Sequence, residues 1–246
     1  MSLDLQYSRW TAALKQAGCP ACRIMKGEAW KYMITLVREG KSHDEVYIRI
    51  QRAWGFCERH GQMLKEIGPA KLGDAMSPTR LCSWLLGVLS MRLSRSERSA
   101  RTAPPPKHKM AQWIMRKTLP GEGIAKRLEV KGICPACDDL SRYERSLLWG
   151  LQRFLSPTQG DETIRRMYQG SDALCLPHLH LALEEVDDEE ASAVLLLQVQ
   201  EQALARLSGN LKDYLRKHDY QYAHEPMSEA EGNSYLRAIA LFVGER

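Results

Sequence analysis

The motif Cys-Pro-Ala-Cys occurs twice in this chain, at residues 19–22 and again at residues 134–137. Each copy is followed by a Cys-x-x-His pair. These pairs are Cys57 with His60 and Cys175 with His178. The two copies of Cys-Pro-Ala-Cys are 115 residues apart, and the two Cys-x-x-His pairs are 118 residues apart. The sequence therefore predicts a duplicated protein with a small insertion in its second copy.

Thiolate and imidazole groups are ligands for zinc, and four of them close a tetrahedral site with no position left for water or substrate. The predicted metal ligands are Cys19, Cys22, Cys57, His60, Cys134, Cys137, Cys175 and His178. They suffice for two zinc ions per chain. The half-sites can pair within one repeat or between repeats, and we expect pairing within each repeat because it closes the shorter loop.

Two other chemistries use the same residues. Three thiolates and one imidazole can hold an iron–sulfur cluster, and a Cys-Pro step also occurs around such clusters. A single Cys-Pro-Ala-Cys is typical of a thiol oxidoreductase, but that motif follows a strand in a βαβ unit, whereas helical patterns flank both copies here. Common catalytic motifs such as G-x-S-x-G, H-E-x-x-H and the P-loop are absent from the sequence. The pattern favours a protein that is not an enzyme.

Helical periodicity runs through both repeats. Apolar residues recur at helical spacing after Cys22 and again after Cys137. Several residues of the second series lie 115 positions after residues of the first series. The sequence predicts an all-α fold, a duplicated helical repeat in which a site of three Cys and one His fixes each half. We expect a first metal-binding repeat over 1–98, a basic connector over 99–131 and a second repeat over 132–246.

One cysteine lies outside these motifs. Cys82 falls on the helix that Ser77-Pro78 is expected to begin. We interpret it as a small buried apolar residue, because no neighbour in sequence is an obvious cause of a lowered thiol pKa.

The connector concentrates the positive charge of a chain whose net charge is +5. A run of three prolines at 104–106 interrupts it. Such a stretch is either a solvated linker or a segment that follows a phosphate backbone without reading bases. The candidate nucleic-acid contacts are Arg95, Arg98, Arg101, Lys107 and Lys109.

The sequence contains no apolar run of about 18 residues that would span a bilayer. Its first residues lack the basic start and apolar segment of a secretory signal, so we expect a reducing cytoplasm and no membrane. In that compartment, closely spaced cysteines indicate metal or redox chemistry rather than structural disulfides.

Taken together, the motifs resemble an uncharacterised bacterial family, a domain of unknown function that pairs C-P-x-C with G-F-C-x-x-H and then C-P-x-C with L-C-x-x-H. The C-terminal residues Lys217-His218-Asp219-Tyr220 and Arg237-Ala238-Ile239 also match that family. The resemblance implies the duplicated architecture and carries no activity. The function we predict is a non-enzymatic, zinc-binding helical scaffold or adaptor with a protein partner or a non-specific nucleic-acid partner. An iron–sulfur redox or sensor protein is the alternative, and a thiol oxidoreductase is the third.

Overall fold

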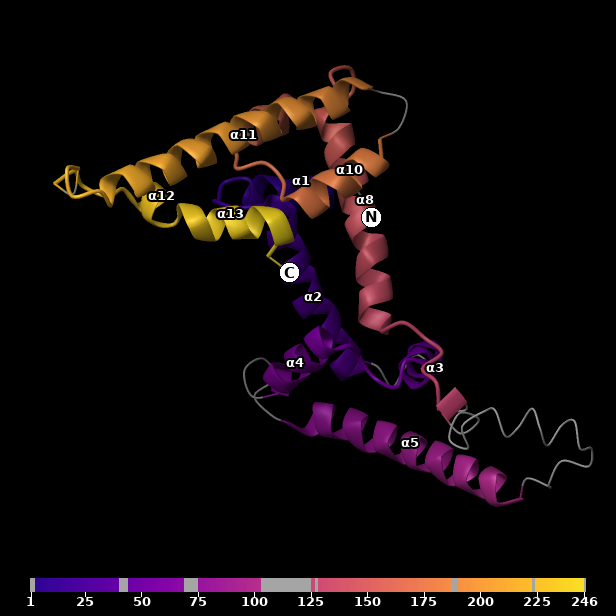
Figure 1. Ribbon diagram of the computed structural model, residues 1–246. Coiled ribbons are helices and arrows are strands. Elements are labelled where there is room, and N and C mark those ends of the chain that lie inside the picture. The colour runs from indigo at the N-terminus through magenta and orange to yellow at the C-terminus, as the bar shows by residue number, and fades with distance from the viewer. Residues whose placement is uncertain are drawn as a thin grey trace, which may run out of the picture. The chain divides into compact units, whose positions relative to one another are not determined.

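The computed structural model describes residues 3–39, 44–68, 75–102, 125–126, 128–186, 190–222 and 224–245. Its helices (Figure 1) are α1 Leu3–Ala13, α2 Pro20–Glu39, α3 Asp44–Arg52, α4 Glu58–Ile67, α5 Met76–Thr102, α8 Pro135–Leu155, α9 Glu162–Gln169, α10 Leu176–Glu184, α11 Glu190–Lys217, α12 Glu229–Gly232 and α13 Ser234–Val243. No strand occurs within the described residues. The predicted all-α fold is confirmed. Among the described helices, none combines the length and the apolar character that a bilayer crossing requires.

The chain divides into two compact units that do not follow its order in sequence. The first unit consists of Met1–Ala29 and Leu140–Arg246, and the second of Trp30–Asp139. Helices α2 and α8 each contribute residues to both units. The division into 1–98, 99–131 and 132–246 describes the repeats and the connector, and it stays a sequence-based prediction.

The core of the first unit is built on α1, the start of α2, the second part of α8, and α9 to α11. Its largest fully buried side chains are Trp10, Tyr168, Leu147, Leu148, Leu151, Leu155, Ile164, Leu174 and Leu196. Helix α1 approaches α8 closely at Gly150, where an added Cβ would lie 1.6 Å from Oε1 of Gln6. Gln6 is itself buried, and its Nε2 donates a hydrogen bond to the carbonyl of Ser146. The absence of a side chain at Gly150 therefore allows this packing.

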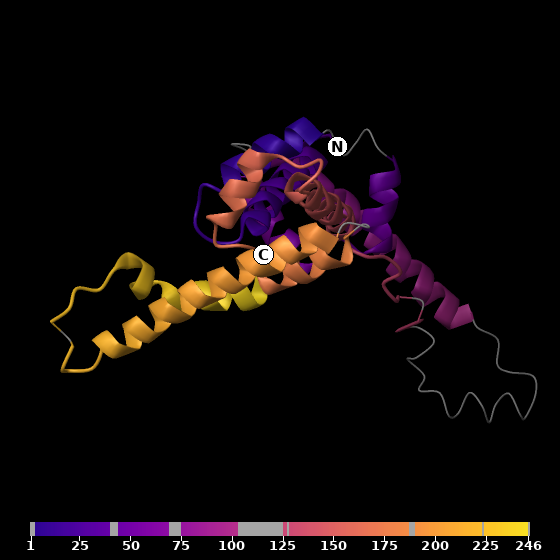
Figure 2. The same ribbon diagram turned by 90° about the horizontal axis from the view of Figure 1, so that it is seen from above.

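Helices α12 and α13 pack on α11. In Figure 2, as in Figure 1, α12 and α13 return alongside α11. Nζ of Lys217, at the end of α11, lies 2.8 Å from Oε2 of Glu231. Glu231 also completes a capping box with Ser228 at the start of α12. This ion pair fixes the return of the chain.

A smaller core holds the second unit together. It consists of Leu36, Val37, Ile50 and Leu81, with Tyr32, Val46, Tyr47, Phe56, Leu64, Trp84 and Leu85 packed against it. Helix α4 lies beside α5. The prediction that Cys82 is buried is wrong, because Leu81 takes the buried position on α5 and the next residue turns about 100° away from it.

Candidate metal centres

All eight predicted ligands gather in two clusters, and each cluster combines one half-site from each repeat. The first cluster is Cys19, Cys22, Cys175 and His178, and the second cluster is Cys57, His60, Cys134 and Cys137. Within each cluster, the candidate ligand atoms all lie within 4.8 Å of one another. The expected pairing within each repeat is therefore wrong. The shorter loop saves too little free energy to decide the pairing, because closure entropy grows only with the logarithm of loop length.

The first cluster lies wholly in the first unit, where two helices begin close together. Cys19 precedes Pro20, the first residue of α2, and Cys175 is the N-cap of α10, which has a proline in its first turn. Proline suits these positions because the first N–H groups of a helix have no intrahelical partner. Each short motif thus places its first cysteine just before a helix and its second ligand in the first turn.

The ligand atoms of the first cluster converge on one point. Nδ1 of His178 lies 3.0 Å from Sγ of Cys175, 3.3 Å from Sγ of Cys22 and 3.5 Å from Sγ of Cys19. The sulfur atoms of Cys22 and Cys175 are 3.6 Å apart. Two sulfurs on a tetrahedral zinc, with bonds of about 2.3 Å, stand roughly 3.8 Å apart. The spacing therefore suits four ligands around a single ion.

The second cluster repeats this geometry in the second unit. Cys57 is the N-cap of α4, and Cys134 directly precedes α8. Nδ1 of His60 lies 3.2 Å from Sγ of Cys57, 3.4 Å from that of Cys137 and 3.6 Å from that of Cys134. The sulfurs of Cys57 and Cys137 are 3.5 Å apart. In both clusters, Nδ1 is the histidine nitrogen that faces the thiols.

A left-handed backbone residue precedes each Cys-x-x-His pair by two positions. In the first repeat this residue is Gly55, with φ of 109°, and in the second it is Ala173, with φ of 60°. Glycine adopts this conformation freely, whereas alanine pays about 1–2 kcal/mol for it. In the first repeat Trp54, with φ of 57°, is left-handed as well, so positive-φ backbone precedes both Cys-x-x-His pairs.

Electrostatics in the first cluster favour a bound cation. Burial, together with the neighbouring Cys175 and Cys22, raises the pKa of Cys19 well above its usual value. Hydrogen bonds from the other two thiols lower the pKa of Cys175. Burial alone would lower the pKa of His178, but hydrogen bonds with Cys175, Cys22 and Glu144 raise it to about 11. A positive ion among the sulfurs would favour the thiolate form of Cys19, which burial disfavours.

The second cluster differs in the state of its histidine. Burial and the nearby charge of Arg59 lower the pKa of His60, which keeps its imidazole neutral and able to act as a ligand. Burial and the neighbouring thiols Cys57 and Cys134 raise the pKa of Cys137 to about 12. Burial also opposes ionisation of Cys57, but backbone N–H groups and the other two thiols lower its pKa. Here too, a cation would favour the thiolate form of Cys137, which burial disfavours.

The two histidines differ in whether a carboxylate lies beside the ring nitrogen that points away from the thiols. Nε2 of His178 lies 2.7 Å from Oε1 of Glu144, which is on α8. A carboxylate in this position fixes the ring and its tautomer, and it makes the metal-facing nitrogen more basic. Nε2 of His60 is also buried, but no carboxylate pairs with it among the described residues. At the 115-residue offset, Ala29 occupies the position that corresponds to Glu144.

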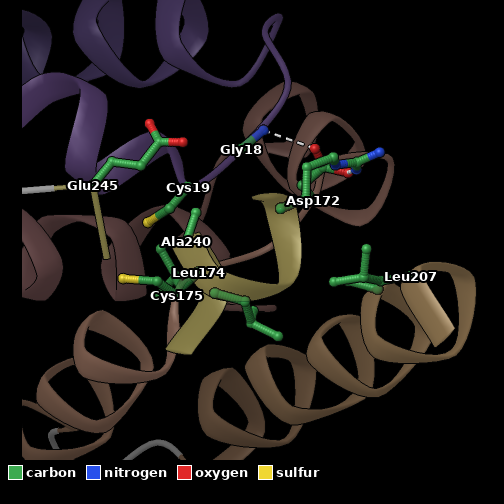
Figure 3. A pocket seen from close by; sticks show the side chains of 11 residues that line it. Gly18, Cys19, Asp172, Leu174, Cys175, Leu207, Ala240 and Glu245 are labelled. Atoms are coloured by element: carbon green, nitrogen blue, oxygen red, sulfur yellow. Dashed lines mark hydrogen bonds and ion pairs between the residues drawn. The ribbon is translucent and has the colours of Figure 1, made fainter. Parts of the chain in front are cut away.

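A small pocket opens beside the first cluster. It has a volume of about 50 Å³, and its walls are Gly18, Cys19, Asp172, Leu174, Cys175, Ala203, Leu207, Arg237, Ala240, Leu241 and Glu245. Figure 3 shows the sulfur atoms of Cys19 and Cys175 on one side, with Gly18 and Asp172 at another edge. The N–H of Gly18 donates to Asp172, which also pairs with Arg237 on α13. The N–H of Glu245, just after α13, donates to Sγ of Cys22 at 3.3 Å. The C-terminal segment therefore lies directly against the cluster.

Charged residues of α3 support the second cluster. Arg49 pairs with Asp138 at 2.8 Å and with Asp139 at 3.0 Å, and it donates to the carbonyl of Pro135. The hydroxyl of Tyr32 donates to Asp139 as well. These contacts hold the first turn of α8, which carries Cys137.

The candidate nucleic-acid contacts divide between two parts of the chain. Arg95 and Arg98 are exposed on α5. The side chain of Arg101, together with Lys107 and Lys109, lies outside the described residues.

A family of unknown function, DUF6062, matches residues 9–246. The chain belongs to this family. Neither a curated protein nor a solved structure matches it.

In this DUF6062 chain, the motifs identified the eight candidate ligands, but they did not identify the residues that support them. Glu144, Asp172 and Arg49 are single charged residues in helices or loops, and no repeated pattern marks them. The 115-residue offset gives no signal for Glu144 either, since Ala29 stands at the corresponding position.

Proposed function

We propose that this protein is a non-enzymatic helical scaffold that holds two zinc ions, one in each cluster. The observation that carries the proposal is the spacing of the ligand atoms, which all lie within 4.8 Å of one another in each cluster, with four pairs in each at 3.0–3.6 Å. This is about the edge length of a zinc tetrahedron with sulfur and nitrogen ligands.

The same spacing argues for a single ion rather than an iron–sulfur cluster. A cluster distributes its protein ligands over several iron atoms, so the ligand atoms stand further apart than four atoms that share one ion. In each cluster here the candidate ligand atoms all lie within 4.8 Å of one another, which supports a single ion over an iron–sulfur core. A colourless divalent ion that accepts thiolate and imidazole ligands fits better, and zinc is the commonest such ion in three-Cys, one-His sites.

A structural role follows from the complete ligand sets. Four protein ligands leave no open position for a substrate or a reactive water. The Cys-Pro-Ala-Cys thiols face Cys-x-x-His ligands, so they would be engaged by the metal rather than available for disulfide exchange. A reducing compartment such as the cytoplasm would keep these thiols free to bind zinc.

A metal ion in the second cluster would also fix the ends of the segment that contains the connector. Cys134 and His60 meet across 74 residues, and the segment between them contains the basic stretch. An ion in the second cluster would thus hold together both ends of this segment. The scaffold would present the segment to a protein or nucleic-acid partner, with Arg95 and Arg98 exposed within it on α5.

Elemental analysis of the purified full chain, with an absorption spectrum of the same sample, tests the proposal. We expect two zinc ions per chain and no visible absorption. Cys82→Ser is the matched control, since this cysteine is exposed and outside both clusters, and it must keep both ions. A brown sample that contains iron and bleaches on reduction would establish the iron–sulfur alternative, and a folded chain without metal would end the zinc proposal.

A further inference from the structure

The two clusters differ in how well their ligands are protected. In the first cluster, Cys22 and Cys175 are 2% and 1% exposed, and only Cys19 is partly exposed. In the second cluster, both Cys57 and Cys137 are partly exposed. A thiolate must be reached by solvent before an oxidant can attack it, so the second cluster offers two reactive sulfurs where the first offers one.

The surroundings differ in the same direction. The first cluster borders the larger core, with Tyr168, Leu174 and Ala182 fully buried near it, and the N–H of Glu245 covers Cys22. The second cluster borders a core of four buried residues. Local opening costs less free energy where few apolar contacts must be broken.

Support for the histidine differs as well. Glu144 lies 2.7 Å from the outer nitrogen of His178, whereas no carboxylate pairs with the outer nitrogen of His60 among the described residues. Loss of such a carboxylate partner typically lowers metal affinity about 10- to 100-fold. On this ground alone, the second cluster binds its ion more weakly than the first.

We propose that the second cluster is a peroxide-sensitive zinc site, in which Cys57 and Cys137 form a disulfide and release the ion while the first cluster keeps its own. This inference rests on the proposed zinc function. The sulfur atoms of Cys57 and Cys137 already lie 3.5 Å apart, and they must approach to about 2.05 Å in the disulfide. The oxidant is hydrogen peroxide or a related hydroperoxide.

The reaction balances with one peroxide. One thiolate attacks a peroxide oxygen, the O–O bond breaks, and a sulfenic acid forms with loss of water after protonation. The second thiolate attacks the sulfenic sulfur, an S–S bond forms, and a second water leaves. Two thiolates, one hydrogen peroxide and two protons thus give one disulfide and two waters. Zinc leaves as an unchanged divalent ion because two of its four anionic or neutral donors have been consumed.

Release of this ion would remove the link between His60 and Cys134, which bound the segment that contains the basic stretch. The new disulfide would still join Cys57 to Cys137, so the two ends of the segment would stay close together. The oxidised site would keep the loop closed but lose the tetrahedral order around His60 and Cys134. A dithiol reductant and added zinc would restore the original site.

The experiment titrates the zinc-loaded full chain with hydrogen peroxide and measures released zinc with a chromophoric chelator. Cysteines are then alkylated with N-ethylmaleimide in denaturant and mapped by peptide mass spectrometry. We expect the first of two zinc equivalents to leave as the disulfide between Cys57 and Cys137 forms, while the cysteines of the first cluster are recovered as alkylated thiols. The zinc of the first cluster should leave second and need at least about 10-fold more peroxide or time, because the carboxylate of Glu144 supports its histidine.

Two variants sharpen the test. Cys137→Ser should hold one zinc, and peroxide should release it only at the dose of the second phase. Glu144→Gln removes the carboxylate charge beside His178 with little change of shape, so it should shift only the second phase toward lower dose. Glu162→Gln is its control, an exposed carboxylate on α9 that pairs with neighbouring arginines of the same helix.

Each outcome decides between the two proposals. A parent protein that holds two zinc ions but releases them together, or loses the thiols of the first cluster first, overturns this inference and leaves the proposed function standing. Release of the remaining zinc of Cys137→Ser at the first-phase dose overturns it equally. A parent protein without zinc before any peroxide is added overturns both.

Discussion

The sulfur atoms of Cys22 and Cys175 lie 3.6 Å apart, although 153 residues separate them in the sequence. Pairing Cys22 with Cys57 would close a loop of only 35 residues. The free-energy cost of closing the longer loop exceeds that of the shorter loop by only about 1.3 kcal/mol. The many buried side chains that bring α2 and α10 together outweigh so small a term.

This pairing is tested by double substitutions. Cys22→Ala with Cys175→Ala removes two ligands of one cluster, so we expect loss of one zinc ion of the two. Cys22→Ala with Cys57→Ala removes a ligand from each cluster, so both ions should be lost or weakened. Elemental analysis after gel filtration gives the count. The reverse result for the two double variants would restore pairing within the repeats.

Removal of zinc by a strong chelator should destabilise the protein, because the binding free energy of a structural ion is largely folding free energy. At free zinc about 1,000 times the dissociation constant, each site contributes about 4 kcal/mol. For a chain of this size, that corresponds to a fall in melting temperature of roughly 8–16 °C per site. Calorimetry with and without chelator measures the change, and re-addition of zinc must reverse it.

Arg49 should matter to the second cluster although it is not a ligand. Arg49→Met removes the contacts to Asp138, Asp139 and the carbonyl of Pro135, which hold the turn that carries Cys137. We expect a loss of about 1–2 kcal/mol in zinc binding at this site, reduced by the partial exposure of the pair. A zinc competition titration measures it.

Arg52→Met is the matched control for that substitution, because this neighbouring arginine of α3 has an exposed side chain. Equal losses of zinc affinity in the two variants would mean that α3 acts through its general stability, and a loss confined to the first cluster would contradict the assignment.

The ion pair between Lys217 and Glu231 should make the docking of α12 pH-dependent. The hydrogen bond from Lys217 is the main cause that lowers the pKa of Glu231 to about 2. Because the folded pKa lies below the unfolded value near 4.5, the pair stabilises the protein above that pH and loses its effect as pH falls toward 2.

Glu231→Gln removes the titrating group of that pair. The difference in hydrogen exchange of residues 226–236 between parent and variant should be largest at neutral pH and should shrink below about pH 4.5. Loss of zinc in acid would change hydrogen exchange in both proteins alike, so its effect cancels in the difference between them. A difference that grew on acidification would have the wrong sign for this pair.

The basic connector and the end of α5 that precedes it provide the test for a nucleic-acid partner. The variant with Arg95, Arg98, Arg101, Lys107 and Lys109 replaced by Ser should lose retention on a DNA or RNA column at low salt. If all five contact phosphates, parent affinity should fall on the order of 10²–10³-fold between about 50 and 200 mM salt.

A control variant replaces five exposed basic residues elsewhere, namely Lys15, Lys65, Arg80, Arg166 and Lys212. It has the same net charge and should keep the retention of the parent. A parent protein with no salt-dependent retention would leave the connector as a solvated linker and rule out the nucleic-acid role.

The sequence by itself determined the helical class and the candidate ligands of both metal sites. Helical periodicity follows from which side chains one face of a helix must bury, and it is local. The spacing of Cys19 and Cys22, or of Cys175 and His178, is local too, since one helical turn brings both side chains of a pair to the same place. Such features can be predicted because they depend on a few neighbouring residues.

The tertiary structure alone decided which half-sites meet. Pairing depends on the packing of α2 with α10 and of α4 with α8, and the sum of many buried contacts fixes that packing rather than any one spacing. The same holds for Glu144 behind His178 and for the exposure of Cys82 beside the buried Leu81. Each depends on the direction in which a side chain points once its helix is packed, and that direction follows from contacts between residues far apart in the sequence.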